Sequence, residues 1–271
     1  MSENILHRIV ETKRKEVKAL RARCSARKLK AAAEAAAPAR NFFSAVTKRP
    51  LRLLNVIAEI KKASPSAGVI RPDFDPEAIA RQYAAAGADA ISVLTDREYF
   101  QGSLDFVGIV REAVELPVLR KDFIIDSAQI YESRAAGADA ILLIAAALPA
   151  GQLLDLLILA VELRMTVLVE VHDADELMQM RSVVGFGHKA FSLLGINNRD
   201  LTTFEVDVGT TVRLAELAGP DVPIVSESGI KTHQDVQRLA GAGVKALLIG
   251  ETLMRSDDVS AKIEELLGPV G

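Results

Sequence analysis

The chain has 271 residues, of which 49% are hydrophobic and 25% are charged, and its formal net charge is −3. This length allows one large globular domain or two small ones with a substantial core. A pI of about 5.9 argues against a general nucleic-acid surface, which needs a basic face. Cys24 is the only cysteine, which excludes a disulfide framework and a cysteine zinc site. A reducing compartment fits, and we expect a cytoplasmic protein.

The ends and apolar stretches of the chain predict no membrane association. The first residues lack the basic-then-apolar order of a signal peptide. The segment 140–161 is long and nearly uncharged, but it is interrupted by Pro149, Gly151 and Asp155. A buried strand, a turn and a core helix explain this stretch better than a membrane span. The histidines form no metal-ligand pattern such as HExxH; they are His7, His172, His188 and His233.

Residues 1–48 differ from the rest in being rich in Lys, Arg, Glu and Ala. Their apolar residues recur at helical spacing, which predicts one or two amphipathic helices. These apolar residues are Ile5, Ile9, Val17 and Leu20. The basic residues 13–15 alternate with acidic ones, and we interpret them as a solvated helix face rather than a binding patch. We therefore expect an N-terminal helical extension over 1–48, followed by the main fold over 49–271.

The main fold shows a regular alternation of apolar runs and helical patterns. The apolar runs cover 54–60, 90–94, 118–123, 140–145, 166–171, 191–196, 224–226 and 246–249. Most are continuous, as expected for strands buried on both faces. The helical patterns cover roughly 76–86, 104–114, 127–136, 152–163, 174–183, 208–218, 233–240 and 259–267. Eight strand–helix units predict an α/β fold, a closed (β/α)8 TIM barrel behind the helical extension.

Polar residues gather at the predicted carboxyl ends of the strands, which line the active site in such a barrel. Glu59 and Lys61 are two residues apart in the first strand, so their side chains share one face. An acid and a base on a hydrophobic strand are costly unless that face meets a polar site. Other strand ends supply Lys121, Glu170, Asn197, Arg199, Glu227 and Ser228.

Three glutamates and three cations thus converge on one mouth. A lysine among cations and apolar walls has a lowered pKa, and a desolvated carboxylate has a raised pKa. Such groups suit proton transfer near pH 7. Any one of them alone is equally explained by a structural ion pair, but all six together favour catalysis.

The last two strand ends predict an anion site. Gly229 and Gly250 allow the backbone to approach a ligand closely. The segment from Glu251 has the pattern of a short helix, whose N-terminal amides favour phosphate. Phosphate sites after strands seven and eight are common in this fold, while ordinary turns are the alternative. The pattern indicates a phosphate, without specifying which ester.

Two further loops are candidates for substrate contact. Ser64 and Pro65 open a long connection after the first strand, and long loops in barrels often cover the substrate. The same composition also suits a plain loop. Phe100 and Phe123 follow the second and third strands and could form walls for a flat ring, although packing is the more common use of single aromatic residues.

Together these segments resemble indole-3-glycerol phosphate synthase, the ring-closing enzyme of tryptophan biosynthesis, over nearly the whole chain. The matching motifs are EIKKASPS at 59–66, SVLT at 92–95, YFQGS at 99–103, KDFI at 121–124, EVH at 170–172, GINNRDL at 195–201, SESGI at 226–230 and LIGE at 248–251. Several independent motifs in the right order are far more specific than any one of them.

The resemblance implies the reaction and the roles of the strand-end residues. The substrate is 1-(2-carboxyphenylamino)-1-deoxyribulose 5-phosphate, and the products are indole-3-glycerol phosphate, carbon dioxide and water, with no metal or organic cofactor. Lys121 is then a general acid at the ketone. Glu170 and Glu59 handle protons and stabilise developing positive charge. Lys61 contacts the anionic substrate and serves as an acid in dehydration.

The same resemblance assigns the remaining candidates to binding. Asn197 and Arg199 orient the substrate and the catalytic groups, and Glu227 borders the ring pocket. The resemblance implies that Ser228, Gly229, Gly250 and the backbone of Glu251 bind the phosphate. Ser64 and Pro65 then line the substrate. Because position 251 is acidic here, we expect its side chain to point away from the phosphate.

Two alternatives stay open. One is another sugar-phosphate barrel such as phosphoribosylanthranilate isomerase, which lacks the N-terminal extension and the combination of Glu59 and Lys61 with Ser64-Pro65. The other is a non-catalytic ligand-binding barrel. Partners are expected to be a phosphorylated small molecule, with no nucleic acid and no membrane. We expect a monomer or weak homodimer without a fused isomerase barrel.

Overall fold

The computed structural model describes residues 5–186, 191–200 and 203–270. Two residues mentioned above, His188 and Leu201, lie outside this part of the chain. Over the described residues, no helix is both long and apolar enough to cross a membrane.

Eight parallel strands close into a barrel in the order β1-β10-β9-β8-β7-β6-β5-β4. They are β1 (Asn55–Ile60), β4 (Ala90–Leu94), β5 (Val118–Lys121), β6 (Ala140–Ile144), β7 (Thr166–Val171), β8 (Ser192–Asn197), β9 (Ile224–Glu227) and β10 (Ala246–Ile249). The predicted barrel is confirmed, with small differences at strand ends. β5 stops at Lys121, and β9 continues to Glu227, so both residues lie at the last position of a strand.

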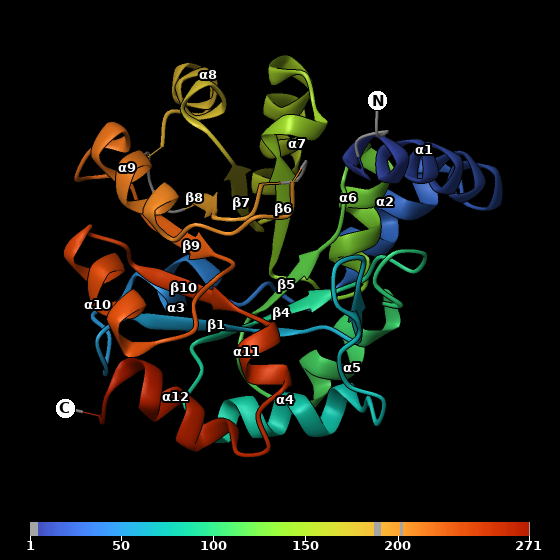
Figure 1. Ribbon diagram of the computed structural model, residues 1–271. Helices are drawn as coiled ribbons and strands as arrows, with labels where there is room; N and C mark the ends of the chain where they lie inside the picture. The colour runs from blue at the N-terminus through green and yellow to red at the C-terminus, as the bar shows by residue number, and fades with distance from the viewer. Residues whose placement is uncertain (1–4, 187–190, 201–202, 271) are drawn as a thin grey trace.

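Helices surround the barrel (Figure 1). They are α4 (Pro76–Ala85), α5 (Asp105–Ala113), α6 (Ser127–Ala135), α7 (Ala150–Glu162), α8 (Ala174–Val184), α9 (Gly209–Ala218), α10 (His233–Gly241), α11 (Glu251–Met254) and α12 (Val259–Leu267), with a 3-10 turn at Ala145–Ala147. Several begin at side-chain caps; Asp75, for example, accepts the amides of Glu77 and Ala78. The short α11 after β10 was expected from the sequence.

Apolar side chains form two main layers of core. One layer fills the space between strands and helices. The other fills the barrel interior, where Ile57, Leu119 and Leu168 meet side chains from other strands. Helix α3 (Phe42–Thr47) adds Phe42 and Val46 to this inner layer, both fully buried. This helix was not predicted from the sequence, because six residues are too few for a visible helical period.

The N-terminal helices α1 (Ile5–Arg23) and α2 (Ala26–Ala35) pack on one side of the barrel, beside α6 (Figure 1). The prediction of a solvated basic face on α1 is correct for Arg14 and Lys15, which are exposed. It is wrong for Lys13, whose side chain is only 2% exposed. Its ammonium meets carboxylates from two barrel loops, and such long-range partners cannot be read from helix periodicity.

The loop after β1 contains a small hairpin that the sequence analysis did not predict. Its strands are β2 (Ala63–Ser64) and β3 (Gly68–Val69), paired antiparallel. Gly68 adopts φ 64°, a conformation that glycine allows without strain. The hairpin places Ser64 and Pro65 at the mouth of the barrel.

Candidate active site

A cavity of about 520 Å³ opens at the carboxyl ends of the barrel strands. Every candidate residue from the sequence analysis lines it: Glu59, Lys61, Ser64, Pro65, Phe100, Lys121, Phe123, Glu170, Asn197, Arg199, Glu227, Ser228, Gly229, Gly250 and Glu251. These residues come from strands and loops far apart in the chain, and closure of the barrel brings them together.

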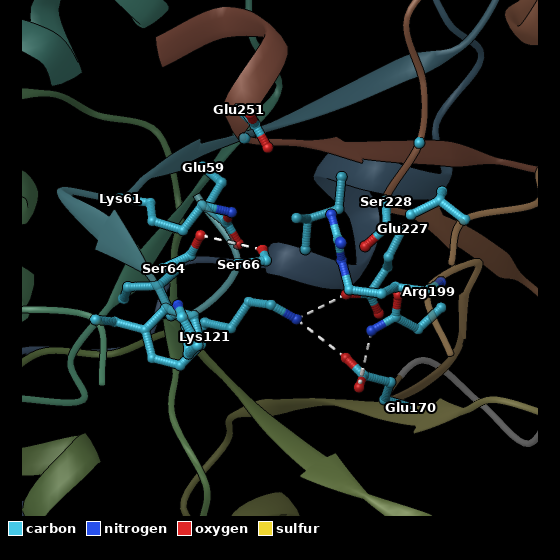
Figure 2. Close-up of a pocket in the computed structure, with 18 of the residues that line it drawn as sticks. Glu59, Lys61, Ser64, Ser66, Lys121, Glu170, Arg199, Glu227, Ser228 and Glu251 are labelled. Atoms are coloured by element: carbon cyan, nitrogen blue, oxygen red, sulfur yellow. Dashed lines mark hydrogen bonds and ion pairs between the residues drawn. The ribbon is translucent and has the colours of Figure 1, made fainter. Parts of the chain in front are cut away.

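Lys121 lies at the centre of the polar part of the cavity, between two glutamates (Figure 2). Its ammonium donates to Oε2 of Glu170 at 3.0 Å and to Oε2 of Glu227 at 2.7 Å. All three side chains are largely withdrawn from solvent, and the glutamates are 4% and 2% exposed. Their charges therefore interact through a medium of low effective dielectric constant.

The pKa values of the two glutamates in this cluster shift in opposite directions, while that of the lysine rises. Burial alone would lower the pKa of Lys121, but Glu170, Glu227 and Glu59 outweigh it and the net shift is upward. The expectation of a lowered lysine pKa was wrong, because carboxylates rather than cations surround this amine. Burial raises the pKa of Glu227 to about 8 against the opposing effect of Lys121. For Glu170, burial is outweighed by Lys121 and His172, so its pKa falls.

Glu59 and Lys61 form a second acid–base pair at the end of β1. Lys61 Nζ donates to Oε1 of Glu59 at 2.6 Å, and Glu59 is 3% exposed. Gly250 makes room for this pair, since a Cβ there would lie 2.2 Å from Oε1 of Glu59 and 3.1 Å from Nζ of Lys61. The shared strand face predicted from the sequence is therefore filled by a tight ion pair.

Side chains on both sides hold Glu170 in place. Asn197 Nδ2 donates to Oε1 of Glu170 at 3.2 Å, and Nε2 of His172 lies 3.2 Å from the same oxygen. His172 also meets Oε2 of Glu176 through Nδ1, at 3.2 Å. Burial opposes protonation of this imidazole, but Glu170 and Glu176 raise its pKa to about 10. His172 lies within the EVH motif, but its contact with Glu170 was not predicted from the sequence.

Arg199 is positioned mainly by its own loop. Its backbone N–H donates to Oδ1 of Asn197 at 3.0 Å, and its Nη1 donates to the carbonyl of Phe204 at 3.2 Å. The guanidinium thus faces the cavity from the β8 loop, beside Glu170 and Glu227 in Figure 2.

The backbone after β9 and β10 shapes the anion end of the cavity. Ser228 and Gly229 adopt φ 66° and 78°, two successive left-handed conformations that turn the chain sharply. Thr252 Oγ1 donates to the carbonyl of Ile230 at 2.8 Å and links the two segments. Glu251 pairs with Arg255 at 2.9 Å. Lys231 and Arg255 also line the cavity, and neither cation was predicted from the sequence because both lie beyond the strand ends.

The opposite part of the cavity is apolar. The rings of Phe100 and Phe123 lie 6.1 Å apart between centroids, tilted by 36°. Helix α1 adds the apolar side chains of Ile5, Leu6 and Ile9 to the lining of the cavity. Their spacing was visible in the sequence but was interpreted only as a helix face, since its docking site could not be inferred.

A closed parallel barrel with acids, bases and an anion end at one mouth defines a TIM-barrel enzyme. Solved structures support the fold alone. The tryptophan synthase A-subunit of Pyrococcus furiosus is 13% identical, with a TM-score of 0.59 over 80% of this chain and 99% of that one. Thiamine phosphate pyrophosphorylase of the same organism is 15% identical, with a TM-score of 0.56 over 80% and 95%.

Sequence comparison identifies the family. The family model of indole-3-glycerol phosphate synthase matches residues 6–266. A protein of that name from Neisseria gonorrhoeae is 52% identical over 265 residues, 97% of this chain and 99% of the relative. One from Geobacillus kaustophilus is 48% identical over 264 residues, 97% of each. The chain belongs to the indole-3-glycerol phosphate synthase family, which confirms the resemblance drawn from its motifs.

Proposed function

We propose that the chain converts 1-(2-carboxyphenylamino)-1-deoxyribulose 5-phosphate into indole-3-glycerol phosphate, carbon dioxide and water. The observation that carries this proposal is the ammonium of Lys121, which is held between Glu170 and Glu227 in a cavity that aromatic side chains and the segments after β9 and β10 also line. A substrate with an aromatic ring at one end and a phosphate at the other fits this layout. Its reacting carbonyl then lies near the charged cluster.

Ring closure needs an electrophilic ketone, and Lys121 supplies the proton and the positive charge. The ring carbon that bears the carboxylate attacks the ketone carbon, and the ketone oxygen becomes a hydroxyl as it takes a proton from Lys121. The new ring then carries positive charge, which the ionised Glu170 stabilises at close range. Loss of carbon dioxide returns the electron pair of the broken bond to the ring.

The final step removes the new hydroxyl group as water. A proton donor must protonate this oxygen, and a base must remove a proton from the substrate. Lys61 and Glu59, 2.6 Å apart, are a donor and an acceptor already paired at the same mouth. We assign Lys61 as the acid in this step and Glu59 as a group that takes up protons.

Glu227 lines the cavity, and one of its two carboxylate oxygens is buried without a partner in the part of the chain that the structure describes. Its Oε2 binds Lys121, while its Oε1 is buried with no hydrogen-bond partner among the described residues. A buried oxygen without a partner is costly unless a ligand satisfies it. We propose that the substrate supplies this partner, and that Asn197 and Arg199 orient Glu170 and the substrate around it.

The phosphate binds at the other end, to the backbone of Ser228, Gly229, Gly250 and Glu251. Left-handed backbone at Ser228 and Gly229 makes a tight turn, and successive backbone N–H groups in such turns form concave sites for anions. The pairing of Glu251 with Arg255 supports the expectation that this carboxylate turns away from the phosphate. Ser64 and Pro65 close over the substrate from the hairpin of the β1 loop.

No metal or organic cofactor is required, since Lys121 supplies the charge at the carbonyl. The protein works in the cytoplasm as a monomer or weak homodimer, with residues 1–48 as an extension on a barrel over 49–271. Sedimentation equilibrium of the full chain would measure the oligomeric state.

The experiment is turnover of the proposed substrate by the purified protein in the presence of a chelator. The chain has no tryptophan, so indole fluorescence comes from the product alone. We expect one carbon dioxide per indole formed. An isomerase barrel would rearrange its sugar phosphate without releasing carbon dioxide, and a non-catalytic barrel would show affinity without turnover.

A further inference from the structure

The buried ammonium of Lys13 ties helix α1 to two separate loops of the barrel. It lies 2.8 Å from Oδ2 of Asp96, in the loop after β4, and 2.9 Å from Oδ1 of Asp122, directly after β5. Its third partner is Glu16 of the same helix, at 2.8 Å. Lys13, Asp96 and Asp122 are 2%, 0% and 3% exposed, so solvent screens these contacts little.

Both aspartates also hold the backbone of the aromatic wall. Oδ1 of Asp96 accepts the N–H of Phe100 at 3.3 Å, and also that of Tyr99 at 2.7 Å. Oδ1 of Asp122 accepts the N–H of Phe123 at 2.8 Å. A single aspartate therefore connects the ammonium of Lys13 to the backbone N–H of each phenylalanine in the cavity lining.

The fully buried charges of the cluster are two cations and two carboxylates. Arg120 Nη2 donates to Oδ2 of Asp122 at 3.0 Å, and the more exposed Glu16 and Glu132 contact Lys13 and Arg120 from the edge of the cluster. Burial alone would lower the pKa of Lys13, but Asp122 and Asp96 outweigh it and the net shift is upward. The lysine thus stays charged. A neutral side chain in its place would leave a buried anion without its partner.

We propose that Lys13 is a positioning residue that acts through Asp96 and Asp122 to hold Phe100 and Phe123 against the aromatic ring of the substrate. This inference rests on the proposed function for the identity of the ring. It assigns α1 a specific task at the site, which is to support from outside two loops that Thr95 already joins, since Thr95 Oγ1 donates to Oδ2 of Asp122 at 2.6 Å.

The test uses the double variant Lys13→Met/Asp96→Asn in the full chain. The double change removes one cation and one anion, so Arg120 and Asp122 remain a balanced pair. The amide introduced by Asp96→Asn keeps a side-chain carbonyl that can accept the N–H groups of Tyr99 and Phe100. The buried ion pairs of Lys13 with the loops are lost, while the contacts of Thr12 Oγ1 with the Tyr99 hydroxyl at 3.0 Å and of Arg21 Nη2 with Oδ1 of Asp126 at 2.7 Å remain. Lys15→Met is the matched control, because Lys15 is on the same helix and exposed.

The first readout is kinetic. We expect the double variant to raise the KM for the substrate roughly tenfold, because the ring loses its fixed wall, while kcat changes less. Competitive inhibition by inorganic phosphate, which probes the other end of the cavity, should be unchanged, as should all parameters of Lys15→Met. An unchanged KM would overturn the inference, as would an equal loss of affinity for inorganic phosphate.

The second readout does not depend on the reaction. Hydrogen exchange of the protein without substrate should accelerate over residues 95–104 and 121–126 in the double variant and stay unchanged in the barrel strands. Unchanged exchange in these loops, or acceleration throughout the molecule, would overturn the positioning role. A wild-type protein without turnover would instead contradict the proposed function, and the exchange experiment would still decide the role of Lys13.

Discussion

Lys121 and Glu227 are 106 positions apart in the chain, yet Nζ of the lysine lies 2.7 Å from Oε2 of the glutamate. Their strands, β5 and β9, are not neighbours in the barrel, since β6, β7 and β8 lie between them. The contact therefore crosses the barrel mouth. It places a cation with a raised pKa beside a carboxyl group whose pKa is about 8.

The Gly250→Ala variant should lose activity through Glu59 and Lys61. A Cβ at position 250 would lie 2.2 Å from Oε1 of Glu59, so this carboxylate must move. A displacement of about 1 Å can cost roughly a hundredfold in rate, and we expect kcat to fall by ten- to a hundredfold. The matched control is Gly151→Ala, where an added Cβ meets no atom within 4 Å. Steady-state kinetics of both variants would decide, and wild-type kcat in Gly250→Ala would argue against a role for this pair.

The Gly229→Ala variant should weaken phosphate binding. Gly229 adopts φ 78°, and a Cβ there would lie 2.3 Å from Cγ1 of Val206. We expect KM to rise about tenfold with little change in kcat, since the phosphate is remote from the reacting atoms. Gly268→Ala is the control, because its φ of 79° imposes similar strain in open space. Inhibition by inorganic phosphate should weaken only in Gly229→Ala; equal inhibition of both variants would remove Gly229 from the anion site.

The pH dependence of stability should reveal His172. Its pKa is about 10 in the folded protein against an ordinary value of 6.5, so the folded state binds more protons between these limits. The stabilisation is complete below pH 6.5 and fades as pH rises toward 10, with a slope of at most about 1.4 kcal/mol per pH unit. Glu227, whose pKa is raised to about 8, adds a similar trend at lower pH.

Denaturant unfolding of the wild type and of His172→Gln from pH 6 to pH 10 isolates the histidine. The wild type should lose stability over this range, and the variant should lose less. His7→Gln is the control, because His7 is exposed on α1. Parallel curves for the wild type and His172→Gln would show that the contacts with Glu170 and Glu176 do not hold the imidazole charged.

Much of the barrel was predictable because strands buried on both faces leave continuous apolar runs in the sequence. Once the strands are placed, Glu59, Glu170 and Glu227 stand out as acids at strand ends. The cavity lining follows from fold geometry, since all carboxyl ends of parallel barrel strands meet at one mouth.

Features that depend on long-range contacts were not predictable. The burial of Lys13 requires Asp96 and Asp122 from two other loops, and the direction of the pKa shift of Lys121 depends on which charges surround it. Helix periodicity indicates only that a face is polar or apolar. The contact between His172 and Glu170 could not be predicted either. Residues two positions apart in a strand share a face, but the sequence does not indicate whether their side chains make contact.

The most direct test of the account is a single-turnover experiment with equal amounts of protein and substrate, comparing the wild type with Lys121→Met. Lys245→Met, at an exposed position before β10, controls for loss of a lysine. The account predicts an indole signal from the wild type and the control, and a rate at least about a hundredfold lower in Lys121→Met with substrate still bound. Closure at near wild-type rate in folded Lys121→Met would contradict the role of Lys121 as the acid.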